Sequence, residues 1–119
     1  MTRQLIEGTA YLLIFNDWTQ AHKAADALGH SVPIWDTRVR AISLVGAYER
    51  AAQILGIENL NQYPLTFELQ RMIVTDHRDW FGGWLSAEPL RSLVSYNDKI
   101  ASSKSDVIQL LEKALNELV

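Results

Sequence analysis

The chain has 119 residues, of which 48% are apolar and 21% charged, with no cysteine and a formal net charge of −3. The length suits one helical domain over residues 1–119, and the missing cysteines exclude disulfides, thiolate catalysis and cysteine-bound zinc. The acidic balance argues against a dedicated nucleic-acid surface. The apolar run over residues 10–15 is too short to span a membrane, so we expect a cytoplasmic protein.

The first element expected is a helix over residues 2–15, with apolar side chains at Leu5, at Ile6 and near its end. A short buried strand over residues 11–15 is the alternative, because a brief apolar run has no diagnostic period. We favour the helix, since no later segment offers a convincing partner strand.

A second helix is expected over residues 18–28, with Trp18, Ala25 and Leu28 on one face and Gly29 at its end. Asparagine and aspartate directly before this segment are good N-terminal caps. The pattern therefore favours two consecutive helices in the first 29 residues.

The most regular pattern lies over residues 36–55, inside an expected central helix near 34–56. Gly56 suits the left-handed position that ends a helix. Gly46 costs about 1 kcal/mol relative to alanine in a helix interior, which favours a close neighbouring backbone at that point. The apolar positions follow the spacing of one buried helical face: Ala41, Leu44, Val45, Tyr48, Ala51, Ala52 and Leu55.

The second half of the chain predicts three more helices. One begins at Pro64, which suits a first helical position, and carries Trp80 on its buried side before the glycine pair at 82–83 breaks it. A short helix follows over residues 90–94. An amphipathic helix from Ser105 or Asp106 to the C-terminus docks on the core or reaches a second subunit.

These elements predict an all-α fold, a compact bundle of five or six helices around the central helix near 34–56. The alternative is an α+β fold with the short strand near 11–15.

Residues 24–39 resemble a helix-turn-helix, with alanines in a first helix, glycine in the turn and apolar anchors after it. Arg38 and Arg40 are the cations that this resemblance would bring to DNA. They are few, and the chain is acidic, so a plain pair of helices with no DNA contact explains the pattern better.

Arg71 and His77 stand in an R-x5-H spacing on a helical stretch. This spacing resembles the R-x(4–6)-H signature of HEPN-type helical ribonucleases, in which an arginine and a histidine meet across a dimer and cleave RNA. The resemblance implies proton transfer by His77 and stabilisation of phosphorane charge by Arg71. A surface cluster of charges at a helix end is the alternative interpretation.

Three side chains at helical spacing, His22, Asp26 and His30, could share a face in the manner of metal ligands. Without further support such residues are ordinary surface residues, and we expect neither a metal nor a cofactor.

The aromatic residues Trp80, Phe81 and Trp84 surround the glycine pair. They suit a protein-binding hot spot about as well as a buried plug.

The sequence favours a small, acidic, non-catalytic module with a regulatory, inhibitory or accessory role. Its expected partner is another protein, with a basic surface that complements the acidic chain. Trp80, Phe81 and Trp84 are the candidate contact residues, and a homodimer is compatible with the terminal helix. The ribonuclease with Arg71 and His77 and the DNA-binding regulator with Arg38 and Arg40 are the alternatives.

Overall fold

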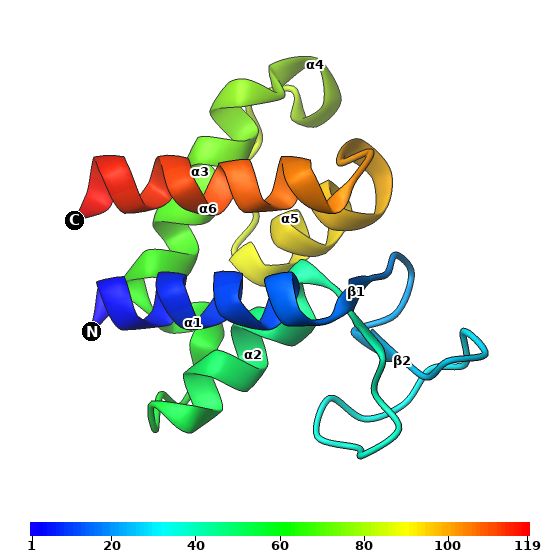
Figure 1. Ribbon diagram of the computed structural model, residues 1–119. Helices are drawn as coiled ribbons and strands as arrows, with labels where there is room; N and C mark the ends of the chain where they lie inside the picture. The colour runs from blue at the N-terminus through cyan, green and yellow to red at the C-terminus, as the bar shows by residue number, and fades with distance from the viewer.

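The protein consists of six α-helices and one small sheet (Figure 1). The computed structural model describes all of residues 1–119. The helices are α1 (Thr2–Phe15), α2 (Leu44–Ile54), α3 (Pro64–Asp76), α4 (Arg78–Phe81), α5 (Pro89–Ser95) and α6 (Lys104–Leu118). A 3-10 turn, η1 (Leu60–Gln62), precedes α3, and a π-helix, η2 (Tyr96–Ile100), follows α5. The prediction of a mostly helical protein is confirmed.

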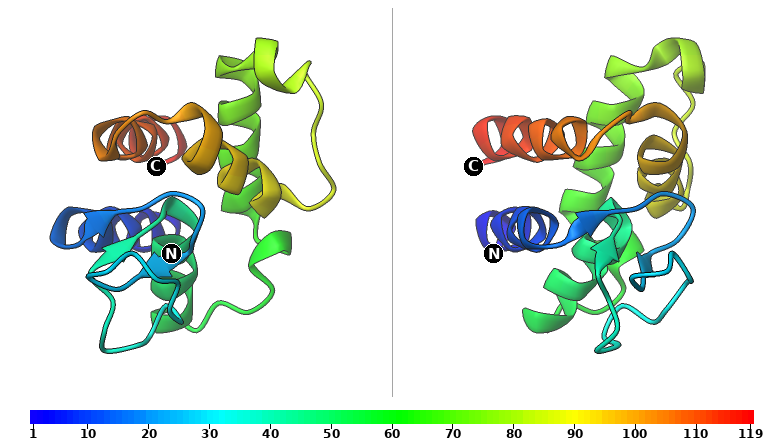
Figure 2. Two further views of the ribbon diagram at one scale, coloured as in Figure 1. Left: turned by 90° about the vertical axis from the view of Figure 1, so that its right-hand side faces the viewer. Right: turned by 45° about the vertical axis from the view of Figure 1, so that its right-hand side comes forward.

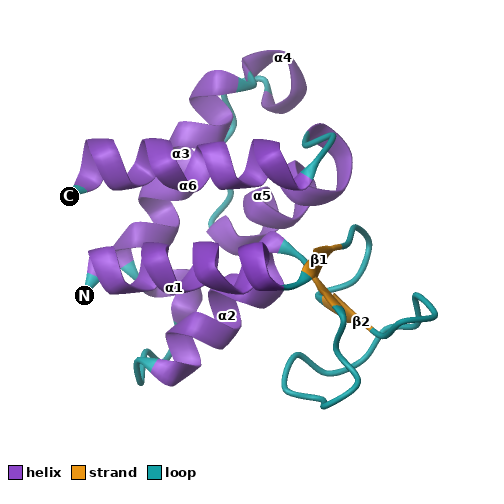
Figure 3. Ribbon diagram, in the orientation of Figure 1, coloured by secondary structure: helices purple, strands orange, loops and turns teal.

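The sheet lies at one end of the helical body (Figure 3) and consists of β1 (Asp17–Trp18), β2 (Ala24–Ala25) and β3 (Ala41–Ile42). Its central strand is β3, which pairs in parallel with β1 and antiparallel with β2. A strictly all-α fold is therefore wrong. The alternative of an α+β fold is supported in that short strands are present, but the strand expected near residues 11–15 does not form, because α1 continues to Phe15.

The helix predicted over residues 18–28 does not form. Ala21 has a φ of 69°, which no right-handed helix accommodates, and the chain on either side of it pairs with β3 as β1 and β2. Gln20 reaches across to η2, where its side-chain amide donates to the carbonyl oxygens of Asn97 and Ala101. Contacts with distant parts of the chain thus replace the local hydrogen bonds of a helix.

The central helix is shorter than predicted and begins at Leu44 instead of near residue 34. Ser43 caps it, with its hydroxyl oxygen accepting from the backbone N–H of Gly46 at 3.0 Å. The predicted end is confirmed: Gly56 has a φ of 73°, and the N–H of Ile57 returns to the carbonyl of Ala52. The residues before Ser43 instead form a loop and β3.

The helices pack in two directions around one core. α1 and α6 lie side by side and run in opposite directions, and α3 crosses them (Figures 1 and 2). α6 docks on the core with one side of its apolar stripe, while Ile108, Leu115 and Leu118 of the same stripe are only partly buried. The fully or nearly buried members of the stripe are Val107, Leu110, Leu111 and Ala114.

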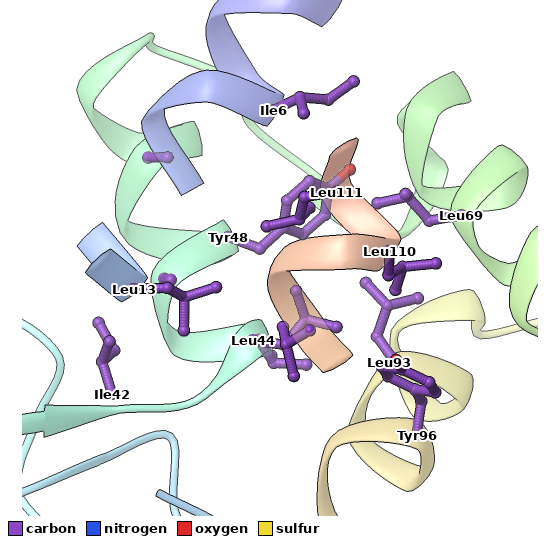
Figure 4. Close-up of a cluster of buried hydrophobic side chains, with 14 of the residues drawn as sticks. Ile6, Leu13, Ile42, Leu44, Tyr48, Leu69, Leu93, Tyr96, Leu110 and Leu111 are labelled. Carbon is purple, nitrogen blue, oxygen red and sulfur yellow. The ribbon is translucent and has the colours of Figure 1, made fainter. Parts of the chain in front are cut away.

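Tyr48 of α2 stands in the middle of this core (Figure 4) and is fully buried. Its hydroxyl lies 2.8 Å from that of Thr66, which donates in turn to the carbonyl oxygen of Leu60. Burial raises the pKa of Tyr48 above its ordinary value. The polar end of the largest core side chain is therefore satisfied, and α2 is joined to the start of α3.

Candidate functional site

The carboxyl end of α3 leads into a segment that stands away from the rest of the molecule (Figure 1). α3 ends because His77 leaves the helical region, with φ −129° and ψ 48°, and α4 then begins. Gly82 and Gly83 follow with φ of 61° and 76°, left-handed values that glycine adopts without strain. We call residues 78–85 the aromatic projection.

Three large apolar side chains of the aromatic projection are exposed to solvent: Trp80 is 56% exposed, Trp84 73% and Leu85 54%. Phe81 differs, because it packs partly buried against the core. The prediction that Trp80 lies on the buried side of its helix is wrong, since α3 ends four residues earlier. Of the aromatic candidates, the two tryptophans are available to a partner.

Two hollows meet at Asp76, His77 and Ile100, and the second of them adjoins the aromatic projection. One, of about 330 Å³, is lined by α3, η2 and α6, and the other, of about 550 Å³, by the end of α3, α4 and η2. We call the two hollows together the α3 cleft. Its charged side chains are Asp76, Arg78, Asp79, Lys99, Asp106 and Lys113.

Two of the acidic groups of the α3 cleft have partners within the chain. Asp76 accepts a hydrogen bond from Lys113 at 2.8 Å, and this bond raises the pKa of the lysine. The carboxylate of Asp106 accepts from the backbone N–H and the hydroxyl of Ser102, and these bonds lower its pKa. The carboxylate of Asp79 forms no hydrogen bond or ion pair.

The side chains of His77 and Tyr96 form part of the wall of the α3 cleft. The rings of His77 and Tyr96 lie 5.6 Å apart between centroids, at an angle of 46°. The Tyr96 hydroxyl donates to the backbone carbonyl of Asp106, and burial raises the pKa of Tyr96 to about 12. At neutral pH Tyr96 is therefore a protonated hydrogen-bond donor that fixes η2 against the start of α6.

The shape of this wall depends on Asn97, a fully buried side chain inside η2. Its Oδ1 accepts from Nε1 of Trp18 at 2.8 Å and from the N–H of Leu44 at 3.0 Å, and its Nδ2 donates to the carbonyl of Thr19. π-helical turns are rare in proteins overall, but those that do occur are often found at functional sites. The sequence pattern indicated only a helix end here, because nothing local distinguishes a π-helical turn.

Arg71 and His77 do not meet within one chain. Arg71 forms an ion pair with Glu68 at 2.6 Å, which raises the pKa of the arginine, and it does not line the α3 cleft. His77 lines both hollows. Any joint action of the two side chains would therefore need a second copy of the chain.

Arg38 and Arg40 are held by their own loop. Arg38 forms two hydrogen bonds of 2.9 Å with the carboxylate of Asp36, and they lower the pKa of that carboxyl to about 2. Arg40 donates to the carbonyl oxygens of Thr37 and Val39. Residues 24–39 contain no helix. The alternative of a helix-turn-helix is therefore wrong for this segment, and so is the plain pair of helices that we favoured.

The spacing of His22, Asp26 and His30 does not gather them into a set of ligands. Asp26 lies 3.6 Å from His30, while its carboxylate accepts from the N–H groups of Leu28 and His30, of which the latter does most to lower its pKa. No group of three or more histidine, aspartate or glutamate side chains is arranged to hold a metal ion. The chain also has no helix with the length and apolarity needed to cross a bilayer.

Comparison with known proteins places the sequence in one family. Residues 1–117 match the model described as a family of unknown function (DUF6197). The chain belongs to this family. Searches of curated proteins and of solved structures found no match. Because the DUF6197 match covers nearly the whole chain, the α3 cleft and the aromatic projection lie inside the family region.

Proposed function

We propose that this DUF6197 protein is a small, acidic, non-catalytic protein-binding module of the cytoplasm, with a regulatory, inhibitory or accessory role. The observation that carries the proposal is the joint exposure of Trp80, Trp84 and Leu85 on the aromatic projection. Tryptophan and arginine dominate the energetics of protein interfaces, and the projection combines two tryptophans with Arg78.

The position of these side chains supports the same interpretation. Trp84 is 73% exposed, so it contributes little to the hydrophobic core. Such exposure of neighbouring large apolar groups is a recurrent mark of contact surfaces on soluble proteins. A partner that buries them gains about 25 cal/mol for each Å² of apolar surface removed from water.

The charge of the chain suggests the chemistry of the partner. With a formal net charge of −3, the protein attracts a basic surface over a distance of about one Debye length, roughly 8 Å at physiological ionic strength. Complementary charge speeds association more than it tightens the final complex. We therefore expect a basic protein partner whose association rate falls as salt is added.

The test is affinity capture from the native host, followed by mass spectrometry, with wild type, Trp84→Ala and Phe15→Ala. Phe15 is a matched control, because it is 69% exposed on α1 and outside the projection. We expect one specific partner that Trp84→Ala loses and Phe15→Ala retains. An equal catch from all three proteins, or no specific catch, contradicts the proposal.

An RNA cleavage assay on wild type and His77→Ala separates this function from the ribonuclease. We expect both proteins to be equally inactive. Cleavage by wild type that His77→Ala abolishes would establish the ribonuclease instead and refute the non-catalytic module.

A further inference from the structure

Most lysine and arginine side chains of the protein have a hydrogen-bonding or ion-pair partner within the chain, but two do not. Of the eleven lysines and arginines, six form ion pairs with carboxylates. Three others, Arg40, Arg50 and Lys104, donate to backbone carbonyl oxygens. Only Arg78 and Lys99 have neither kind of partner, and both line the 550 Å³ hollow of the α3 cleft.

The 550 Å³ hollow has an excess of unpaired positive charge, although the protein as a whole is acidic. Arg78 lies at the start of α4 and Lys99 on η2, so the two free cations come from different elements. Of the two carboxylates in the hollow, Asp76 is already neutralised by Lys113 at 2.8 Å, which leaves Asp79. The hollow thus presents two free cations to one free carboxylate.

Two further side chains complete the lining on the same side. His77 forms no side-chain hydrogen bond within the chain, so its ring can offer an N–H donor. Trp80 lines the hollow and is 56% exposed, which leaves indole surface for a planar group. Aromatic side chains of this kind stack on nucleobases of any sequence.

We propose that the α3 cleft binds a nucleoside phosphate. Arg78 and Lys99 form charge-assisted hydrogen bonds to the phosphate oxygens, His77 donates a further hydrogen bond, and the base stacks on Trp80. Asp79 accepts hydrogen bonds from hydroxyl groups of the ribose. The volume of about 550 Å³ lies within the range of sites for small molecules.

The proposed nucleotide site shares Arg78 and Trp80 with the aromatic projection, whereas Trp84, whose replacement tests the protein contact, does not line the α3 cleft. The test of protein binding with Trp84→Ala and the test of nucleotide binding with Lys99→Gln therefore use residues that belong to one site each, and the two proposals can fail independently. If the wild-type protein captures a specific partner but binds no nucleotide, only the nucleotide proposal is refuted. If it binds the nucleotide but captures no specific partner, only the protein-binding proposal is refuted.

The experiment is a titration of the ¹⁵N-labelled full chain with adenosine 5′-monophosphate, followed by NMR. We expect shifts at the Trp80 indole N–H, assigned with Trp80→Phe, and at the backbone of His77 and Lys99. Arg78→Gln and Lys99→Gln each weaken binding about tenfold or more, as the loss of one charge-assisted hydrogen bond predicts. Arg91→Gln is the matched control, since Arg91 is exposed, pairs with Glu88 and lies outside the hollow; it leaves the affinity unchanged.

Parallel titrations identify the part of the ligand that is recognised. Inorganic phosphate and adenosine should each bind at least tenfold more weakly than the nucleotide. Phosphate that binds as tightly as the nucleotide overturns the stacking on Trp80, and adenosine that does so overturns the phosphate contacts. Binding of a single-stranded RNA oligomer without binding of the mononucleotide assigns the cleft to a polynucleotide and overturns the proposal, as does an absence of shifts. Spectra of the free variants that match wild type show that each variant is folded.

Discussion

Replacement of Gly46 in α2 by alanine should destabilise the protein, because the position has no room for a side chain. A Cβ at this position would lie 2.1 Å from the backbone oxygen and 2.9 Å from the carbonyl carbon of Lys23. That oxygen also accepts hydrogen bonds from the N–H and the hydroxyl of Ser43, the residue that caps α2. The backbone of Lys23 must therefore move in Gly46→Ala, and the move disturbs both bonds.

The expected loss of stability follows from three contributions. Alanine is favoured over glycine in a helix by about 1 kcal/mol. Against this, overpacking costs about 1–3 kcal/mol, and two disturbed hydrogen bonds cost about 1 kcal/mol each. The free energy of unfolding of Gly46→Ala should thus fall by about 2–4 kcal/mol, measured by urea denaturation with circular dichroism as a lower midpoint at an unchanged slope.

Gly8→Ala is the control for this experiment. A Cβ on Gly8 of α1 would lie 3.4 Å from the Cβ of Ala51, an ordinary van der Waals contact. This variant should be as stable as wild type or more stable by up to about 1 kcal/mol. If Gly46→Ala matches Gly8→Ala, the close approach of the Lys23 backbone is refuted.

Two other predictions concern η2. Asn97→Ala should lower the free energy of unfolding by about 2 kcal/mol or more in urea denaturation, because it leaves the donors of Trp18 and Leu44 without an acceptor at a cost of about 1–3 kcal/mol each; an unchanged midpoint would contradict this. The pKa of Tyr96 is raised by burial to about 12, from about 10 in an unfolded chain, so folding favours its protonated form. Its contribution to stability is complete below pH 10 and is lost as the pH rises from 10 to 12. Denaturation midpoints should fall less steeply over this interval in Tyr96→Phe than in wild type, and parallel curves for the two proteins would refute this assignment.

Helices with local signals could be predicted from the sequence. α1, α3 and α6 carry apolar side chains at helical spacing, and Pro64 and Gly56 mark a start and an end by their backbone geometry alone. These signals need no knowledge of distant residues. The same holds for the glycines that end α4, which the sequence identified as a break.

The segment between α1 and α2 could not be predicted in this way. Its conformation depends on partners far along the chain: the indole of Trp18 and the amide of Gln20 both bond to η2, nearly eighty residues away. Gly46 also shows that a local pattern does not identify a distant contact partner. It signals a close neighbour, which the pattern suggested was another helix, whereas the neighbour is the backbone of Lys23 in a loop.

Some residues of the candidate site could be identified from the sequence, and others only from the structure. His77, Trp80 and Trp84 stand out in the sequence, because they are distinctive residues close together. Lys99 and Lys113 do not, since they reach the α3 cleft from η2 and α6. Whether a cation is free depends on the pairing of all the others, and only the folded chain shows that pairing.

The π-helix η2 connects these observations, because it belongs to both the scaffold and the site. On one side, Asn97 satisfies buried donors of β1 and α2, and leaving any of them unpaired is costly in a low-dielectric interior. On the other side, Tyr96 and Lys99 line the α3 cleft, one and two residues from Asn97. The hydrogen bonds that hold η2 in place therefore also fix this wall of the cleft before any ligand arrives. A preformed wall reduces the ordering cost of binding, so Asn97→Ala, where it remains folded, should weaken nucleotide binding without removing any group that touches the ligand.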